Sequence, residues 1–353
     1  MITLPKDSPL HNIKISRVVL PTLLGLGVVA YFIVKNVNPE VLKSIHFTSQ
    51  TTFWLLVAAL LMITRDLGYV LRIRMLTDNK LTWLQSIRVI MLWEFTSAIT
   101  PSAIGGTSVA ILYVNKEGIG IGKSSAVVMA TSLLDELYFV IMFPLLLLLI
   151  NSQQLFSIGG GFSFTNPYLI AAVVGYSLKF IWVLIISYAL FKNPRGFKWL
   201  LLHLFRLPIL RRWRAGAHKA GDEIIVSSME LKKKPFKFWL KTFGATALSW
   251  TARYWVVNAL FLAFFTVNDH FLLFARQLVM WIIMLVSPTP GGSGITEYVF
   301  AEYLADYLPY SGIAILLALL WRLYTYYPYL LIGAIIFPRW IKSKFQSKSN
   351  KPE

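Results

Sequence analysis

Two helix-breaking clusters decide the fold of this chain: Thr100-Pro101-Ser102-Ala103-Ile104-Gly105-Gly106 and Ser287-Pro288-Thr289-Pro290-Gly291-Gly292-Ser293-Gly294. Each lies inside a long apolar stretch. In a bilayer an unpaired backbone group is costly, so such breaks are tolerated only where protein or a water-filled cavity surrounds them. A pair of breaks in corresponding positions of two halves is typical of a central site between repeats. The expected tip residues are Pro101, Gly105, Gly106, Pro290, Gly291, Gly292 and Gly294.

The overall composition is that of a polytopic membrane protein. Of 353 residues, 56% are hydrophobic and 14% are charged, and the mean hydropathy is +0.62; soluble domains carry about 25% charged residues. We therefore interpret the net charge of +18 as membrane topology and attraction to anionic lipid, not nucleic-acid binding. There is no cysteine and the five histidines are scattered, so we expect no disulfide, no metal site and no cofactor.

The distribution of Lys and Arg predicts the topology. Residues 192–241 contain thirteen Lys or Arg and three acidic residues, so this basic loop is expected in the cytoplasm, together with the basic tail 341–353. The uncharged segment 151–166 is expected outside. We assign each apolar segment a direction across the membrane so that these loops lie on their expected sides. This predicts about six full spans and cytoplasmic termini, with Arg72 and Arg88 in a cytoplasmic loop. The predicted spans are residues 18–34, 53–71, 125–150, 168–191, 242–266 and 312–337.

Two further apolar stretches, 85–114 and 271–303, must each begin and end on one side of the membrane. Each is expected to be a re-entrant helical hairpin with a Pro-Gly cluster at its tip; the alternatives are ordinary kinks, or full crossings that would raise the count to ten spans. The units at about 53–150 and 242–337 then have opposite orientations, which makes them an inverted-topology repeat. The expected fold is an all-α polytopic membrane protein with one integral membrane domain, residues 1–340.

Ionisable residues inside the predicted membrane segments are the candidate substrate-binding residues. A charge at mid-membrane costs at least about 2.5 kcal/mol, so it normally faces a partner or a wet cavity. We expect the basic candidates to bind a lipid phosphate and the acidic ones to meet a cationic group or a proton. The alternative is a structural salt bridge between the two groups. The candidates are Arg253, Arg322, Glu94, Asp135, Glu136 and Glu297.

Several weaker signals accompany these candidates. Arg65 and Asp66 are adjacent on a predicted helix, where side chains point about 100° apart, so we do not expect them to pair. Glu297 is expected to cap the helix after the second break. The apolar and aromatic segment 197–206 favours helices on an anionic leaflet, although the basic loop could also act only as a topology signal. Small residues such as Gly25 in the first span would allow a homodimer.

The ordered motifs resemble the lysylphosphatidylglycerol synthase transmembrane-region family over roughly residues 15–340. They are Thr289-Pro290-Gly291-Gly292-x-Gly294-x-x-Glu297, Trp321-Arg322-Leu323-Tyr324-Thr325-Tyr326, Thr100-Pro101 to Gly105-Gly106, and Leu134-Asp135-Glu136. The resemblance implies a flippase in a bacterial inner membrane. Many members carry a Glu-Arg pair shortly before the aspartate that matches Asp135. Here Thr131 and Ser132 occupy those positions, so recognition of the same headgroup is not implied.

Larger members of this family join the membrane region to a soluble aminoacyl-transferase domain, which we do not expect here. The expected function is therefore that of a stand-alone lipid flippase-like transporter for a phospholipid or related polar lipid, aminoacylated lipids included, and not an enzyme. One alternative is a non-catalytic membrane scaffold for a lipid-modifying synthase or glycosyltransferase. Another is a membrane-embedded headgroup enzyme that uses Asp135 and Glu136 in acid-base chemistry.

Overall fold

The computed structural model describes residues 47–100, 102–157, 162–204, 206, 214–284, 295–308 and 311–346, and within these residues all regular secondary structure is helical. The predicted span 18–34 lies outside them. The first half contains α3 (Ser49–Leu76), α4 (Trp83–Ile99), α5 (Ser102–Lys116), α6 (Ile121–Leu149), α7 (Ser152–Leu155) and α8 (Pro167–Ser187) with a π-helical extension, Tyr188–Lys192. The second half contains α9 (Pro194–Leu204), α10 (Arg214–Lys232), α11 (Phe236–Phe264), α12 (His270–Ile283), α13 (Ile295–Tyr303), α14 (Ser311–Thr325) and α15 (Tyr327–Ile341).

Three of the described helices are long and apolar enough to cross a bilayer: α3, α6, and α8 with its extension. At 1.5 Å per residue, the 29 residues of α6 extend about 43 Å. The outward face of α8 is apolar, and Leu178, Ile181 and Leu184 on it are each about half exposed. A contiguous exposed apolar face of this kind is typical of contact with lipid. The fold is therefore that of an all-α, multi-pass membrane protein, and the full count of six spans stays a prediction.

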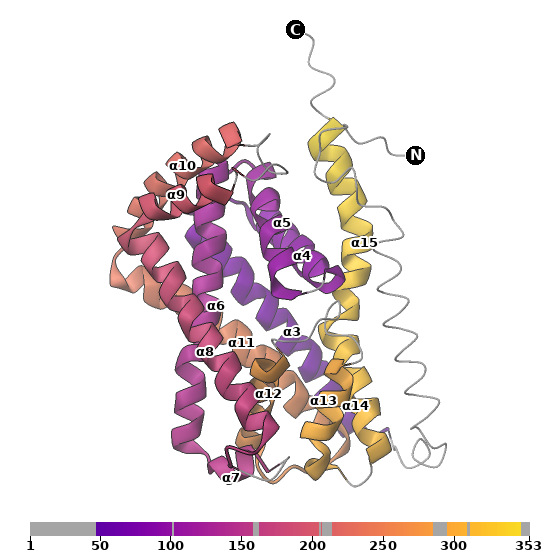
Figure 1. Cartoon of the computed structure of the whole chain (residues 1–353). Helices are drawn as coiled ribbons and strands as arrows, with labels where there is room; N and C mark the ends of the chain where they lie inside the picture. The colour runs from indigo at the N-terminus through magenta and orange to yellow at the C-terminus, as the bar shows by residue number, and fades with distance from the viewer. Residues whose placement is uncertain are drawn as a thin grey trace.

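Helices α3 and α11 form the most extensive helix–helix contact in the described part of the chain and cross the middle of the molecule (Figure 1). They run antiparallel: Thr51 near the start of α3 donates to the carbonyl of Ala263 near the end of α11, and Ser249 donates to the carbonyl of Arg65. Gly68 permits this close approach, since a Cβ there would lie 2.2 Å from Ser249 Oγ. The first helices of the two predicted repeats thus pack in opposite directions, as an inverted repeat requires.

Each predicted hairpin consists of two helices, and a hydrogen bond joins the first helix to the end of the second. Gln85, near the start of α4, donates to the carbonyl of Glu117, just after α5. Arg276 in α12 reaches the carbonyl of Tyr303, the last residue of α13. Figure 1 shows α4 and α5 at the end of the molecule that carries α9 and α10, and α12 and α13 toward the opposite end. The two hairpins therefore enter the bundle from opposite ends, while re-entrance within a bilayer stays a prediction.

The turn at the tip of the first hairpin contains fewer residues than expected. Gly105 and Gly106 do not lie at the turn, because α5 already begins at Ser102 and includes both. Gly106 instead lets the two arms pack closely, since a Cβ there would lie 2.0 Å from Ser97 Oγ. The remaining predicted tip residues, Pro101, Pro290, Gly291, Gly292 and Gly294, lie outside the described residues.

The last predicted span, 312–337, is two helices, with α14 ending at Thr325 and α15 beginning at Tyr327. Pro328 accounts for the division: it lacks an N–H group and its ring would clash with the carbonyl four residues earlier, which kinks or breaks a helix at this point. Proline is tolerated in the first turn of a helix, where Pro328 lies in α15. After this break, the C-terminal half of the segment packs against α4.

Helix α15 closes the first hairpin into a three-helix unit with α4 and α5. The carboxylate of Glu117, whose side chain is fully buried, accepts hydrogen bonds from Arg88, Trp340 and Lys344. At the other end of α15, Tyr326 donates to the carbonyl of Ala98 near the end of α4. The unit is thus fastened at both ends, and we call the contacts of Glu117 the Glu117 clasp.

Candidate functional site

Seven ionisable side chains from α3, α4, α6 and α8 form ion pairs across the helix bundle. We call this set the charged row: Arg65, Asp66, Arg72, Glu94, Asp135, Glu136 and Lys179. Because α3, α6 and α8 are the helices long and apolar enough to span a bilayer, most of the row lies on membrane-crossing segments. Charges in such segments are expensive and mark substrate or ion pathways. The charged row is therefore the candidate site.

The first part of the row is centred on Arg65. Its Nη1 lies 2.8 Å from Asp66 Oδ1, and its Nη2 lies 2.7 Å from Glu94 Oε1 on α4. Tyr329 on α15 accepts a hydrogen bond from Arg65 and donates one to Asp66. Our expectation that Arg65 and Asp66 would not pair is wrong: the long guanidinium side chain reaches round the helix surface, and Tyr329 bridges the two groups.

The second part joins α3 to α6 through Arg72 and Asp135. The guanidinium binds both carboxylate oxygens, with Nη2 to Oδ2 at 3.1 Å, and also donates to Thr246 on α11. Trp250 on α11 donates its indole N–H to the same carboxylate at 2.8 Å. The ring of Tyr69 connects the two arginines, since the guanidinium of Arg72 lies 4.7 Å from its centre and that of Arg65 lies 4.6 Å away.

The third part joins α6 to α8. Lys179 Nζ lies 2.6 Å from Glu136 Oε2 and 4.4 Å from the centre of the Phe139 ring. A lysine in an otherwise apolar helix needs such a partner, because an isolated ammonium in a medium of low dielectric constant is strongly disfavoured. With Asp135 and Glu136 adjacent on α6, the row continues from the α4–α15 side of the bundle to α8.

The row is asymmetric in its contact with solvent. The basic side chains are buried, with Arg65 exposed by 2% and Arg72 and Lys179 by 4% each. The acidic side chains, Asp66, Glu94, Asp135 and Glu136, are each exposed by 21–23%. Three positive charges face four negative ones, so the row carries one net negative charge. What it presents to a ligand is therefore a set of carboxylate edges, which suits a cationic group.

Arg253, a predicted phosphate-binding residue, lies beside the row but outside its ion pairs. Its guanidinium stacks over the rings of Trp250 at 5.7 Å and Trp281 at 5.1 Å, and it makes no salt bridge within the described residues. Trp250 in turn donates to Asp135, so one indole lies between the cation and the carboxylate. Arg253 thus lies near Asp135 without forming a salt bridge with it. The N–H groups of its guanidinium can therefore donate hydrogen bonds to an anion.

Arg322 and Glu297, two other predicted site residues, pair with each other instead of joining the row. Arg322 Nε donates to Glu297 Oε1 at 2.8 Å, both side chains are buried, and Arg322 stacks on Tyr326. Glu297 lies in the first turn of α13, the position that we expected for a residue that caps this helix. Its ion pair with Arg322 joins α13 to α14. The alternative, a structural salt bridge of Arg322 with Asp135 or Glu136, is not found in the described residues, since those carboxylates bind Arg72 and Lys179.

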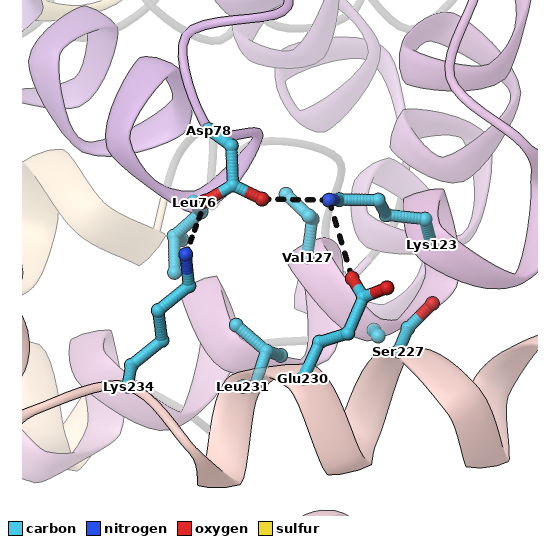
Figure 2. A pocket seen from close by; sticks show the side chains of 9 residues that line it. Leu76, Asp78, Lys123, Val127, Ser227, Glu230, Leu231 and Lys234 are labelled. Atoms are coloured by element: carbon cyan, nitrogen blue, oxygen red, sulfur yellow. Dashed lines mark hydrogen bonds and ion pairs between the residues drawn. The ribbon is translucent and has the colours of Figure 1, made fainter.

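A small surface pocket lies where α10 meets the end of α3 and the start of α6. Figure 2 shows four charges in a chain along it, Lys234 to Asp78 to Lys123 to Glu230. Partial burial raises the pKa of Asp78, but the hydrogen bonds from the two lysines outweigh it and hold the pKa below its ordinary value. Because these charges neutralise one another, the pocket serves to join α10 to the bundle and is not our candidate site.

The sequence contained signals for some residues that we did not select. Lys179 is the one Lys, Arg, Asp or Glu in the predicted span 168–191, so the rule that singled out Arg253 also applies to it. Arg72 was missed because the span was predicted to end at Leu71, whereas α3 continues to Leu76 and buries Arg72. Tyr329 gave no signal, since only the break before α15 brings it to Asp66.

Comparisons with known proteins agree with this architecture. The family model for the lysylphosphatidylglycerol synthase TM region matches residues 18–333. The chain is 27% identical over 328 residues to a UPF0104 membrane protein of Archaeoglobus fulgidus, a match that covers 89% of this chain and 90% of that protein. No solved structure matches. The resemblance found in the sequence motifs is confirmed, and the chain belongs to the lysylphosphatidylglycerol synthase transmembrane-region family.

Proposed function

We propose that this protein is a lipid flippase-like transporter, which moves a phospholipid or related polar lipid, aminoacylated lipids included, between the leaflets of its membrane. The observation that carries the proposal is the charged row. Its carboxylates remain partly exposed in the middle of an apolar bundle, while the cations behind them are buried. A polar path of this kind lets a headgroup cross while the acyl chains stay in lipid.

The chemistry of the row supports a headgroup with both a phosphate and an amine. Arg253, stacked on two indoles and without a carboxylate partner in the described residues, would bind the phosphate through its planar set of N–H donors. Asp135, Glu136 and Glu94 would bind the ammonium. The buried pair of Arg322 and Glu297 would keep α13 and α14 together while the hairpins move, so we assign it a supporting role.

The remaining parts of the proposal concern the setting of this activity. We place the protein in the cell membrane with both termini in the cytoplasm; the bacterial membrane expected from the resemblance remains a prediction, and the matched relative is archaeal. Helices α9 and α10 would lie against an anionic leaflet, where Trp199 and Leu200 are exposed beside basic residues. The lipid would leave chemically unchanged, since transport, not catalysis, is proposed.

Transfer of fluorescent phosphatidylglycerol and lysylphosphatidylglycerol in proteoliposomes tests this function. We compare the wild type with Arg253→Gln, which removes the proposed phosphate contact, and Asp135→Asn, which removes an ammonium contact. Lys80→Gln is the matched control for charge, because Lys80 is exposed in the turn between α3 and α4. Incorporation and folding are matched by size-exclusion profile before rates are compared.

The two substitutions should act differently on the two lipids. Arg253→Gln should slow transfer of both lipids at least about tenfold, the effect of losing roughly 1.4 kcal/mol of charge-assisted hydrogen bonding. Asp135→Asn should slow lysylphosphatidylglycerol more than phosphatidylglycerol, because only the former carries ammonium groups. Background transfer of both lipids by the wild type would refute the flippase proposal for them. A lipid recovered with altered mass would favour the enzyme alternative.

A further inference from the structure

The Arg65 end of the charged row has more negative than positive charge. Arg65 is the one cation that makes a salt bridge with Asp66 or Glu94 within the described residues. Its Nη1 binds Asp66 and its Nη2 binds Glu94, so one guanidinium serves two carboxylates. The two carboxylates are therefore neighbours on the same guanidinium. One cation between two carboxylates leaves one negative charge without a partner, and such a charge inside an apolar bundle is costly unless a further cation compensates it.

The groups around this pair do not supply the missing positive charge. On α3 the neighbours are Arg65 and the neutral ring of Tyr69, and on α15 the neighbour is Tyr329, which donates its hydroxyl to Asp66. Helix α11 contributes Ser249, which binds the carbonyl of Arg65. Arg72, the next cation along α3, is neutralised by Asp135 on α6. The net charge of minus one therefore stays at Asp66 and Glu94.

We propose that Asp66 and Glu94 together form a binding site for one exchangeable proton, and that the ammonium group of a cationic lipid headgroup displaces this proton. This inference rests on the proposed function and names its coupling ion. The step is a simple exchange: an O–H bond of one carboxyl group breaks, the proton leaves to water, and the ammonium ion replaces it as the counter-ion. Charge in the membrane is conserved throughout, which avoids the cost of an uncompensated carboxylate.

Both carboxylates can be reached by a proton from water. Their side chains are exposed by 23% and 21%, whereas that of Arg65 is 2% exposed. In addition, the buried Nε of Arg65 has no hydrogen-bond partner in the described residues. Buried donors of this kind are usually satisfied by an ordered water molecule. A water molecule there would bind the same guanidinium that binds the two carboxylates.

The site also lies at a junction between two packing units. Asp66 belongs to α3, which packs on α11, whereas Glu94 and Tyr329 belong to the three-helix unit that the Glu117 clasp closes. The ion pair with Glu94 and the hydrogen bonds of Tyr329 are thus polar contacts between these units. Protonation of either carboxylate weakens its attraction to Arg65. Loading and unloading of the proton would consequently change how firmly α4 and α15 hold to α3.

Infrared difference spectra of the protein in lipid nanodiscs test proton binding without any transport assay. A pH step in the wild type should change the carbonyl stretch of a protonated carboxyl group. Asp66→Asn and Glu94→Gln should each abolish this signal, because either leaves Arg65 with one carboxylate and a neutral cluster that still folds. Glu302→Gln is the matched control, since Glu302 is exposed on α13, away from the row, and its spectrum should match the wild type.

Proteoliposome transfer then tests the exchange. For the wild type, the apparent affinity for lysylphosphatidylglycerol should fall about tenfold per unit of decreasing pH on the acidic side, as competition with one proton requires. The Asp66→Asn variant should lose this dependence. An unchanged infrared signal in both variants would overturn the proton site. If the infrared signal is present but lipid transfer by the wild type does not depend on pH, the exchange of proton for ammonium is refuted. A transfer rate that responds to sodium ions at fixed pH would refute it as well. A proton signal without any lipid transfer would refute the proposed function alone.

Discussion

Replacing Asp135 by asparagine should destabilise the folded protein by about 2 to 4 kcal/mol. The substitution leaves the guanidinium of Arg72, whose side chain is 4% exposed, without its carboxylate. Removing one partner of a fully buried ion pair typically costs about 3 to 5 kcal/mol. The lower range applies here because the carboxylate is 21% exposed, so water already screens part of the interaction. Trp250 can still donate to the amide oxygen, which limits the loss.

Reversible unfolding in mixed micelles of a mild detergent and sodium dodecyl sulfate, followed by tryptophan fluorescence, measures this change. The control is the double variant Arg72→Met with Asp135→Leu. It replaces the pair by apolar side chains of similar volume and should return to within about 1 kcal/mol of the wild type, since buried pairs are often replaceable in this way. A loss below about 0.5 kcal/mol for Asp135→Asn alone would contradict the reasoning, because it would mean that Arg72 is well solvated.

Three further predictions concern packing, pH and the third ion pair. Gly68→Ala should destabilise the α3–α11 contact by about 1 to 3 kcal/mol, since the added methyl group meets Ser249, whereas Gly244→Ala, with no atom within 4 Å of the new Cβ, should be neutral or stabilising in the same assay. Burial raises the pKa of Glu117, but its three hydrogen bonds outweigh this and lower the pKa below 4.5; the clasp therefore contributes stability above that pH and loses it as the pH falls through the lowered value. The hydrogen-exchange protection factors of residues 340–346, which are corrected for the intrinsic exchange rate at each pH, should fall in acid, and equal protection factors at pH 7 and pH 3 would contradict this. Lys179→Met should impair folding more than Lys179→Met with Glu136→Met, because the single change strands a carboxylate; equal yields of folded protein would exclude the pairing.

Much of the architecture followed from elementary patterns in the sequence. Long apolar runs predicted α3, α6 and α8 within a few residues, and the two helix-breaking clusters predicted the paired helices on either side of them. Helix ends were less predictable. The span before Arg72 was predicted to end too early, because we interpreted this charged residue as the start of a loop. In the structure a carboxylate 63 residues later, that of Asp135, compensates the charge of the buried Arg72.

The candidate site was predicted only in part. The free-energy cost of a charged side chain inside the membrane correctly indicated that Glu94, Asp135 and Glu136 need partners. It does not identify those partners. The partners of Arg65 and Lys179 became visible only when α3, α4, α6 and α8 were packed together. The pairing of Arg322 with Glu297 likewise depends on how α13 meets α14, which no pattern within either helix specifies.

The division between α14 and α15 has a consequence for biosynthesis. Tyr329, which accepts a hydrogen bond from the guanidinium of Arg65, lies 264 residues after it, and Ser249, which donates to its carbonyl, lies 184 residues after it. At about 5 to 20 residues per second, a ribosome needs roughly 10 to 50 s to supply that last partner. During this interval a nascent α3 holds an arginine whose surroundings are incomplete. Its insertion would depend on the translocon or an insertase to shelter that charge until the C-terminal helix arrives.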